Sequence, residues 1–410
     1  MGFDDLKLID PILEAIKAVG YLTPTPIQEQ SIPLILEGKD ILGCARTGTG
    51  KTAAFALPIL QTLSETLPHT KNAVRALILS PTRELAAQIG DCFNDYGRFL
   101  DVRHTVIFGG VNQNPQAAAL RRGIDVLIAT PGRLLDLMQQ NLVKLNGVEI
   151  LVLDEADRML DMGFIPDVRR IISKLSAQRQ TLFFSATLSH NIQRIAADFV
   201  HDPVHVEASP TATTGEEVEQ RVCFVEKDDK RDLLTHFLKD PSYERVLVFT
   251  RTKHGADRVA RHLHRDGINA QAIHGNKSQN ARTRAMDHFR SGETRALVAT
   301  DVAARGIDID DITHVFNFDM PSEPEVYVHR IGRTARAGAV GIAITFCDRE
   351  ERSMLARIEK LIQKTLTVIE DHPYHSAGTA NRHAALATAA PAASRGRRGR
   401  PRGQFRHAGL

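Results

Sequence analysis

The chain has few cysteines, no long apolar run and no basic, apolar start. Its four cysteines (Cys44, Cys92, Cys223 and Cys347) lack a CxxC spacing, which argues against zinc sites and disulfide frameworks and suits a reducing cytosol. Its longest apolar runs have four to six residues, far short of the about 20 that span a bilayer. The start MGFDDLKLID has acids where a secretion signal needs basic residues. We therefore expect a cytoplasmic protein with no membrane partner.

Short Leu-rich or β-branched runs alternate with segments of helical period through most of the chain. This alternation predicts an α/β protein with parallel sheets. The polar stretch ASPTATTGEE (208–217) has no apolar period and indicates a linker between two units of similar size, 1–207 and 218–370. The expected strands are ALIL (76–79), DVLIA (125–129), EILVL (149–153), TLFF (181–184), RVLVF (245–249), RALVA (295–299) and THVFNF (313–318).

Polar signatures follow these runs directly, as SPTREL follows ALIL and DEAD follows EILVL. Ligands of open parallel sheets bind at the carboxyl ends of the strands. Each unit is therefore predicted to present its chemistry along one edge of its sheet.

The segment ARTGTGKT (45–52) fits the phosphate loop G-x-x-x-x-G-K-[ST], except that Ala45 replaces the first glycine. Lys51 can reach the β- and γ-phosphates of a nucleotide, and the Thr52 hydroxyl can bind Mg²⁺. A glycine-rich turn before a helix is the alternative. The predicted phosphate-binding residues are Ala45, Arg46, Thr47, Gly48, Thr49, Gly50, Lys51 and Thr52.

Three carboxylates, Asp154, Glu155 and Asp157, stand at the mouth of an apolar strand. They repel one another unless a cation lies among them. Asp154 can hold the same Mg²⁺ as the phosphate loop, and Glu155 can polarise the attacking water. The alternative is that Asp154 or Glu155 only caps the following helix. For Asp157, an ion pair or hydrogen bond between sites is as plausible as direct chemistry.

These motifs, taken with their flanks, resemble the DEAD-box RNA helicases of superfamily 2. The resemblance implies two tandem RecA-like domains, with ATP and Mg²⁺ as cofactors. RMLDMGF and HGNKSQNAR are further similar to the bacterial RhlE-like subgroup. The ordered motifs are GYLTPTPIQ (20–28), ARTGTGKT, PTRELA (81–86), GG (109–110), TPGR (130–133), DEAD (154–157), SAT (185–187), LVFTRTK (247–253), HGNKSQNAR (274–282), ATDVAARGID (299–308) and HRIGRTARAG (329–338).

The resemblance assigns roles around the nucleotide. Gln28 and Thr25 would read adenine, on which Phe3 would stack, whereas Phe3 taken alone is an ordinary hydrophobic anchor. Gly306 and Asp308 would reach the phosphate and ribose edge. Arg333 and Arg336 would be arginine fingers, which contribute about 10³–10⁵ in rate, so hydrolysis should require closure of the two domains. A solvated basic face is the alternative for the arginines. The residues expected to couple the domains are Asp157, Ser185, Thr187, His329 and Arg330.

The resemblance also implies an RNA path across both domains, made of phosphate and sugar contacts that do not read sequence. We expect unwinding of short duplexes with little sequence preference, by a monomer acting on ribosomal precursors or RNA-decay assemblies. The predicted contacts are Thr82, Arg83, Gly109, Gly110, Thr130 and Arg133 in the first domain, and Arg251, Gly275, Arg282 and Thr300 in the second. Arg46 departs from the family, in which close relatives carry Gln.

The charge of the chain is concentrated at its C-terminal end. The net charge is +3, but residues 372–410 hold seven arginines and no Asp, Glu or Lys, which leaves residues 1–371 at −4. Segment 371–410 lacks apolar residues for a core, and we expect a disordered RNA-binding arm. Deleting 372–410 should then weaken RNA binding. A solubilising tail and, from RGRP, a DNA minor-groove binder remain alternatives.

Two other activities compete with an ATP-dependent RNA helicase. A superfamily 2 DNA translocase is opposed by the Gln28 motif and the DEAD spelling. An ATP-gated RNA clamp with little turnover is opposed by the presence of Lys51, Glu155, Arg333 and Arg336.

Overall fold

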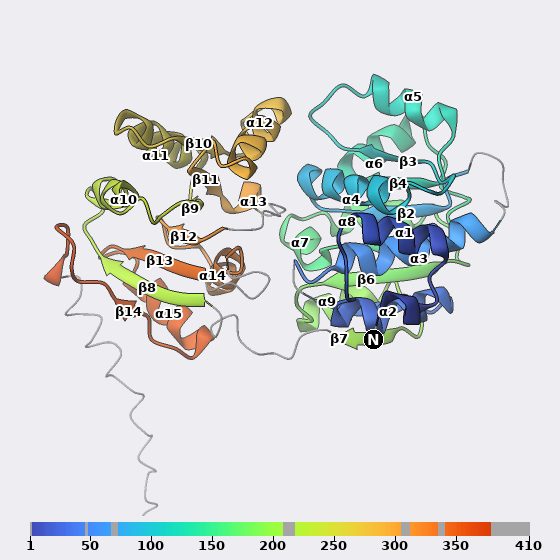
Figure 1. The fold of residues 1–410 in the computed structure, drawn as a ribbon, viewed down its shortest axis with the longest axis horizontal. Coiled ribbons are helices and arrows are strands. Elements are labelled where there is room, and N and C mark those ends of the chain that lie inside the picture. Colours follow the sequence, from blue (N-terminus) through green and yellow to red (C-terminus); the bar gives the residue numbers. More distant parts are fainter. Residues whose placement is uncertain are drawn as a thin grey trace, which may run out of the picture.

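The computed structural model contains two parallel sheets, each covered by helices on both faces (Figure 1). It describes residues 2–45, 48–66, 73–207, 218–304, 312–334 and 341–378. The predicted linker 208–217 and most of the predicted tail lie outside these residues. In the described part of the chain, no helix is long and apolar enough to cross a bilayer.

The first sheet has the strand order β3-β4-β2-β5-β6-β1-β7, and all its pairs are parallel. Its strands are β1 (Ile41–Cys44), β2 (Ala76–Leu79), β3 (His104–Ile107), β4 (Val126–Ala129), β5 (Ile150–Leu153), β6 (Gln180–Ser185) and β7 (Val204–Glu207). Its helices are the 3₁₀ helix η1 (Phe3–Leu6), α1 (Asp10–Ala18), α2 (Pro26–Leu36), α3 (Lys51–Glu65), α4 (Arg83–Tyr96), α5 (Asn114–Arg122), α6 (Pro131–Gln139), α7 (Ala156–Asp161), α8 (Ile165–Ile172) and α9 (His190–Ala197).

The second sheet has the order β10-β11-β9-β12-β13-β8-β14 and is also parallel. Its strands are β8 (Val218–Phe224), β9 (Val246–Thr250), β10 (Ala270–Ile273), β11 (Ala296–Thr300), β12 (His314–Asn317), β13 (Gly341–Cys347) and β14 (Thr367–Val368). Its helices are α10 (Lys230–Lys239), α11 (Lys253–Arg265), α12 (Gln279–Arg290), α13 (Asp301–Ala304), α14 (Pro324–Ile331) and α15 (Arg352–Ile362).

The two sheets share one topology. Numbered within its own sheet, each reads 3-4-2-5-6-1-7, so the second domain repeats the first. In both, the helix after the first strand begins with a buried lysine, Lys51 in α3 and Lys230 in α10. Only the first domain has a phosphate loop before that lysine.

Burial on both faces explains the apolar runs that predicted the strands. In β2, Ala76 and Ile78 join one core cluster, and Leu77 and Leu79 join the cluster on the opposite face. Strands with both faces covered by helices need apolar residues at every position. The seven predicted strands are therefore confirmed to within one residue at each end.

The predicted end of the second domain at residue 370 is too early. His372 is buried and packs against Phe237 with ring centroids 6.4 Å apart. The Ser376 amide donates to the Phe224 carbonyl at 2.9 Å, and the Ser376 hydroxyl donates to Glu226 at 2.6 Å. Residues 371–378 therefore belong to the second domain.

Candidate functional site

The phosphate loop leads from β1 into α3, so its predicted ligands sit at the carboxyl edge of the first sheet. Gly50 caps α3 with φ +88°, in the left-handed region that favours glycine, and a Cβ there would collide with Gln28. Lys51 is the first helical residue, and its Nζ donates to the Ala45 carbonyl at 2.6 Å. Thr52 follows in the first turn. The described end of this loop, residues 48–52, therefore has the glycine conformation and helix start that suit a phosphate-binding turn.

The Gln28 motif contacts the phosphate loop. Gln28 Oε1 accepts from the Thr25 amide at 2.9 Å, and its Nε2 donates to the Gly50 carbonyl at 3.1 Å. Thr25 caps α2, and its buried hydroxyl has no hydrogen-bond partner among the described residues. Gln28 therefore joins the start of α2 to the phosphate loop, beside an unused hydroxyl.

Phe3 is 5% exposed and lies in the core of the first domain, where its ring stacks against Tyr21 at a centroid distance of 6.4 Å. The structure thus gives Phe3 the hydrophobic anchor role. Its contact with adenine stays a prediction.

Asp154 and Glu155 lie at the end of β5 and are both buried. Glu155 adopts φ +51° and ψ 53°, a left-handed conformation that non-glycine residues rarely occupy and that is often held at functional sites. The Glu155 amide donates to Asp154 Oδ1 at 2.9 Å. Burial raises the pKa of Asp154 to about 6, although Lys51 opposes this. A buried carboxylate of this kind gains from a nearby cation.

Glu155 has the opposite electrostatic environment. Burial disfavours its charge, but Arg158, Lys51 and Arg333 together hold its pKa below the usual value. Arg158 of α7 forms a buried ion pair with Glu155, the N-cap residue of that helix. Arg333 belongs to the second domain, so a cation from each domain acts on this carboxylate.

A small cavity of about 40 Å³ lies where the two domains meet, and both Glu155 and Arg333 line it. Asp157 of the first domain and His329 of the second also line it. The Thr187 hydroxyl donates to Asp157 at 3.4 Å, and the Ser185 hydroxyl donates to the Thr187 carbonyl at 2.7 Å. The SAT segment is thus connected through Asp157 to the cavity that faces the second domain.

The predicted RNA contacts of the first domain gather around one loop. Arg133 donates to the Val111 carbonyl at 3.1 Å and to Gln116 at 2.9 Å. Gly110 has φ +76°, a conformation that favours glycine, and the Arg83 guanidinium occupies the space where a Cβ would stand. Gly109 precedes it. Thr82 and Thr130 occupy the N-cap positions of α4 and α6.

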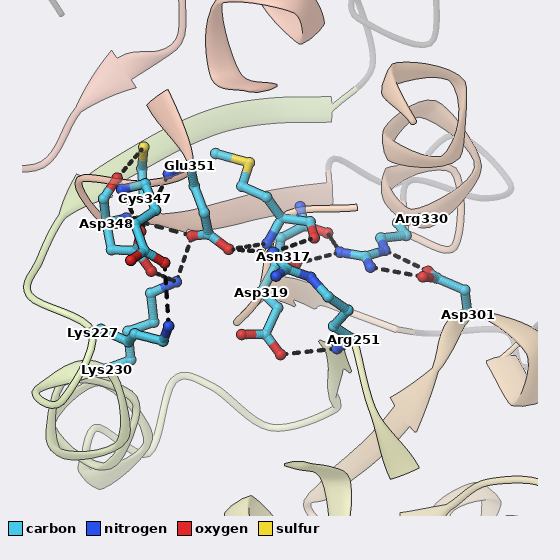
Figure 2. Close-up of polar contacts among 12 residues, drawn as sticks. Lys227, Lys230, Arg251, Asp301, Asn317, Asp319, Arg330, Cys347, Asp348 and Glu351 are labelled. Atoms are coloured by element: carbon cyan, nitrogen blue, oxygen red, sulfur yellow. Dashed lines mark hydrogen bonds and ion pairs between the residues drawn. The ribbon is translucent and has the colours of Figure 1, made fainter. Parts of the chain in front are cut away.

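In the second domain, Arg330 is fully buried and forms a bidentate pair with Asp301, with distances of 2.6 and 2.9 Å (Figure 2). It also donates to Asn317 and to the Asp319 carbonyl. These contacts tie α14 to α13 and β12 within one domain. Its predicted role in coupling the domains stays a prediction.

Arg251 lies beside this network. Its amide donates to Asp319 Oδ2, and its guanidinium donates to Glu351 Oε1, both at 2.8 Å (Figure 2). Glu351 also accepts from the buried Lys230 at 2.5 Å. Gly275 lies exposed in the turn after β10, and Thr300 ends β11.

A polar contact between the domains involves two residues that sequence reasoning did not select. Glu84 lies 2.9 Å from Arg282 and accepts from Gln279 at 3.1 Å, and Gln279 accepts from Arg83 at 3.5 Å. Glu84 belongs to the motif PTRELA and Gln279 to HGNKSQNAR. Membership of these motifs is the sequence feature from which the two residues could have been selected. Five predicted site residues lie outside the described residues: Arg46, Thr47, Gly306, Asp308 and Arg336.

Comparison with protein families gives two matches. Residues 25–195 match the DEAD/DEAH box helicase model, and residues 229–338 match the helicase conserved C-terminal domain. An ATP-dependent RNA helicase CshA of Limosilactobacillus reuteri is 45% identical over 88% of this chain and 72% of its own length. The Bacillus subtilis DEAD-box ATP-dependent RNA helicase CshA is 42% identical over 89% and 73%.

Solved structures agree over both domains. Saccharomyces cerevisiae Dbp5 bound to RNA and ADP BeF₃ matches with a TM-score of 0.80 at 32% identity, over 90% of this chain and 95% of that one. A Dbp5 variant bound to Nup159, Gle1, IP6 and ADP matches at 30% identity over 88% and 95%, with a TM-score of only 0.61. The two domains here are thus arranged more like those of RNA-bound Dbp5. By the family matches and the identity to its relatives, the chain belongs to the DEAD-box family of ATP-dependent RNA helicases.

Proposed function

We propose that this chain is an RNA-stimulated ATP hydrolase that separates short RNA duplexes or remodels RNA–protein complexes. One observation carries the proposal: Glu155 of the first domain and Arg333 of the second line the same cavity. A water polarised by Glu155 and a finger from the other domain can act on one γ-phosphate only while the domains are together. RNA that holds the domains together would therefore stimulate hydrolysis.

Mg²⁺ is proposed to bind Thr52 and Asp154. The raised pKa of Asp154, caused mainly by burial, fits a carboxylate that lacks sufficient positive charge nearby. Magnesium commonly takes one or two carboxylates and completes its shell with phosphate oxygens and water. When bound, it would neutralise charge on the β- and γ-phosphates. Lys51 would exchange its bond to the Ala45 carbonyl for those phosphates, and Gln28 and Thr25 would hold adenine.

The RNA path is proposed to run over Arg83, Arg133 and the Gly109–Gly110 turn, then over Arg251, Gly275, Arg282 and Thr300. The side chains among these suit the backbone of a strand and leave base edges unread, so binding should show little sequence preference. Closure on one strand would bend it and eject its partner, and hydrolysis would reopen the clamp.

Finer assignments are also part of the proposal. RMLDMGF (158–164) and HGNKSQNAR (274–282) favour the RhlE-like subgroup, although the curated relatives above carry the name CshA. We propose a monomer that works in the cytoplasm, on ribosomal precursors or within RNA-decay assemblies.

Steady-state ATP hydrolysis tests the function. The purified protein is assayed without nucleic acid and with matched single-stranded RNA or DNA. Strong stimulation by RNA alone is expected. Equal stimulation by DNA would instead support a translocase, and bound ATP without turnover under any condition would support a clamp.

A further inference from the structure

A basic groove with a volume of about 550 Å³ runs along α11 on the second domain. Figure 1 shows α11 on the side of this domain away from the first. Arg258, Arg261 and Arg265 recur at helical spacing, so they share one face of α11, while Val259 and Leu263 are buried on the other. At about 1.5 Å per residue, Arg258 and Arg265 stand about 10 Å apart along the helix.

A second hollow of about 350 Å³ adjoins this groove because Arg231 and Arg258 line both. It extends from these two arginines to Arg251. We call the combined surface the α11 groove. Its cationic residues, apart from the buried Lys230, are Lys227, Arg231, Arg251, Arg258, Arg261, Arg265 and Lys277.

Few carboxylates neutralise the α11 groove. Asp257 is paired with Lys277 at 2.9 Å and lies 3.1 Å from His274. Asp228 and Asp319 also border the groove, and Asp319 accepts from the Arg251 amide. Within the described part of the chain, the side chains of Arg231 and Arg258 make neither a hydrogen bond nor an ion pair. Lys227 and Arg251 are paired with Glu350 and Glu351, so the excess positive charge lies on the arginines of α10 and α11. This mainly basic surface attracts anions although residues 1–371 have a net charge of −4.

The position of the α11 groove identifies its occupant. Arg251 at one end is a predicted RNA contact, and Lys277 at the other lies two residues after Gly275, which is also predicted. A strand that follows these contacts would enter the groove without leaving the protein surface. The chain's own Arg-rich segment has the wrong sign of charge for this surface.

We propose that the α11 groove binds the phosphate backbone of the same RNA strand where it continues beyond the two-domain clamp. This inference rests on the proposed function and extends it, because it gives the enzyme a second stretch of RNA contact. The contacts are made to phosphates, so they add affinity without sequence preference.

The test is the double variant Arg231→Gln/Arg258→Gln, which breaks no bond seen within the described part of the chain. The matched control is Arg357→Gln/Lys360→Gln, which removes two exposed charges from α15 of the same domain. Affinity for oligouridylates of increasing length is measured over a range of salt concentrations. Each lost phosphate contact should reduce the log–log salt slope by about 0.7, so the test variant should lose about 1.4 on long oligomers. On oligomers that are only long enough to fill the two-domain clamp, its affinity and salt slope should equal those of the wild type.

The outcomes separate this inference from the proposed function. If the wild type shows no RNA-stimulated hydrolysis, the proposed function fails. If the wild type is stimulated but both double variants keep its slope on long oligomers, the groove does not bind the strand. An equal loss of salt slope in both double variants would show a general attraction to the charge of the domain, and it would also contradict RNA binding in the α11 groove. A photoreactive uridine placed beyond the clamp should cross-link to residues 253–265 in the wild type.

Discussion

Arg282 of the second domain lies 2.9 Å from Glu84 of the first, and both side chains are about nine-tenths buried. Arg282 is a predicted RNA contact, and Glu84 follows the predicted contact Arg83. The predicted RNA-binding edges of the two sheets are therefore joined by an ion pair in this arrangement. Removing one partner would leave the other buried and unpaired.

Glu84→Ala should lower RNA-stimulated ATP hydrolysis, because the closed arrangement loses about 2–5 kcal/mol when one member of a buried interface pair is truncated. Arg282→Ala should have a similar effect, and the double variant should be no worse than either. A double-mutant cycle on kcat/KM measures the coupling. Additive losses would mean that the pair is absent from the active form.

Glu155→Gln should retain ATP-dependent RNA binding yet lose turnover by about 10²–10⁴-fold, the range for loss of a positioned base. Lys51→Ala should instead abolish productive ATP binding. Single-turnover hydrolysis and RNA binding with and without ATP distinguish the two. Wild-type turnover in the Glu155→Gln variant would rule out Glu155 as the residue that polarises water.

Lys230→Met should destabilise the second domain by about 3–5 kcal/mol, because it removes the buried cation of two buried carboxylates and leaves Glu351 only the more exposed Arg251. Lys230 is 1% exposed and contacts Asp348 at 3.1 Å and Glu351 at 2.5 Å. Although burial opposes its charge, Glu351 and Asp348 raise the pKa of Lys230. Urea unfolding measures the loss. The control is Lys227→Met, whose exposed pair with Glu350 should contribute less than about 1 kcal/mol.

Acid should destabilise the second domain through His314. Burial, assisted by Arg221, lowers the pKa of His314, which packs 4.4 Å from the Tyr243 ring. As the pH falls below about 6.5, the unfolded chain takes up this proton first, so stability falls. In His314→Phe, the difference in urea stability between neutral and acidic pH should shrink. The exposed His201→Phe variant is the control, and an equal change in both variants would contradict the assignment.

The strands and the phosphate loop could be predicted because both are local patterns. Burial on two faces demands continuous apolar runs, and a phosphate-binding turn demands glycines before a lysine. The pairing of Glu84 with Arg282 joins residues far apart in sequence, and no local pattern specifies it. Residues 371–378 look like a tail for the same reason, because their packing depends on Phe237 and Phe224 in distant elements.

Phe3 shows a second limit of predicting residue roles from sequence. The family resemblance implies a ligand contact for Phe3, but the same residue fills the core beside Tyr21. Sequence spacing cannot say which of the two surroundings covers an aromatic ring. The five predicted residues outside the described part of the chain, Arg333's expected partner Arg336 among them, stay predictions.

Although the two sheets share one topology, the lysines at the starts of α3 and α10 have different partners. At the start of α3, Lys51 donates to the Ala45 carbonyl, which an incoming phosphate can replace. At the equivalent start of α10, Lys230 is permanently neutralised by two carboxylates of its own domain. Lys51 of the first domain can thus exchange its contact for a phosphate. Lys230 of the second domain already has Asp348 and Glu351 where that phosphate would bind. The start of α10 is therefore closed to a phosphate by its own ion pairs.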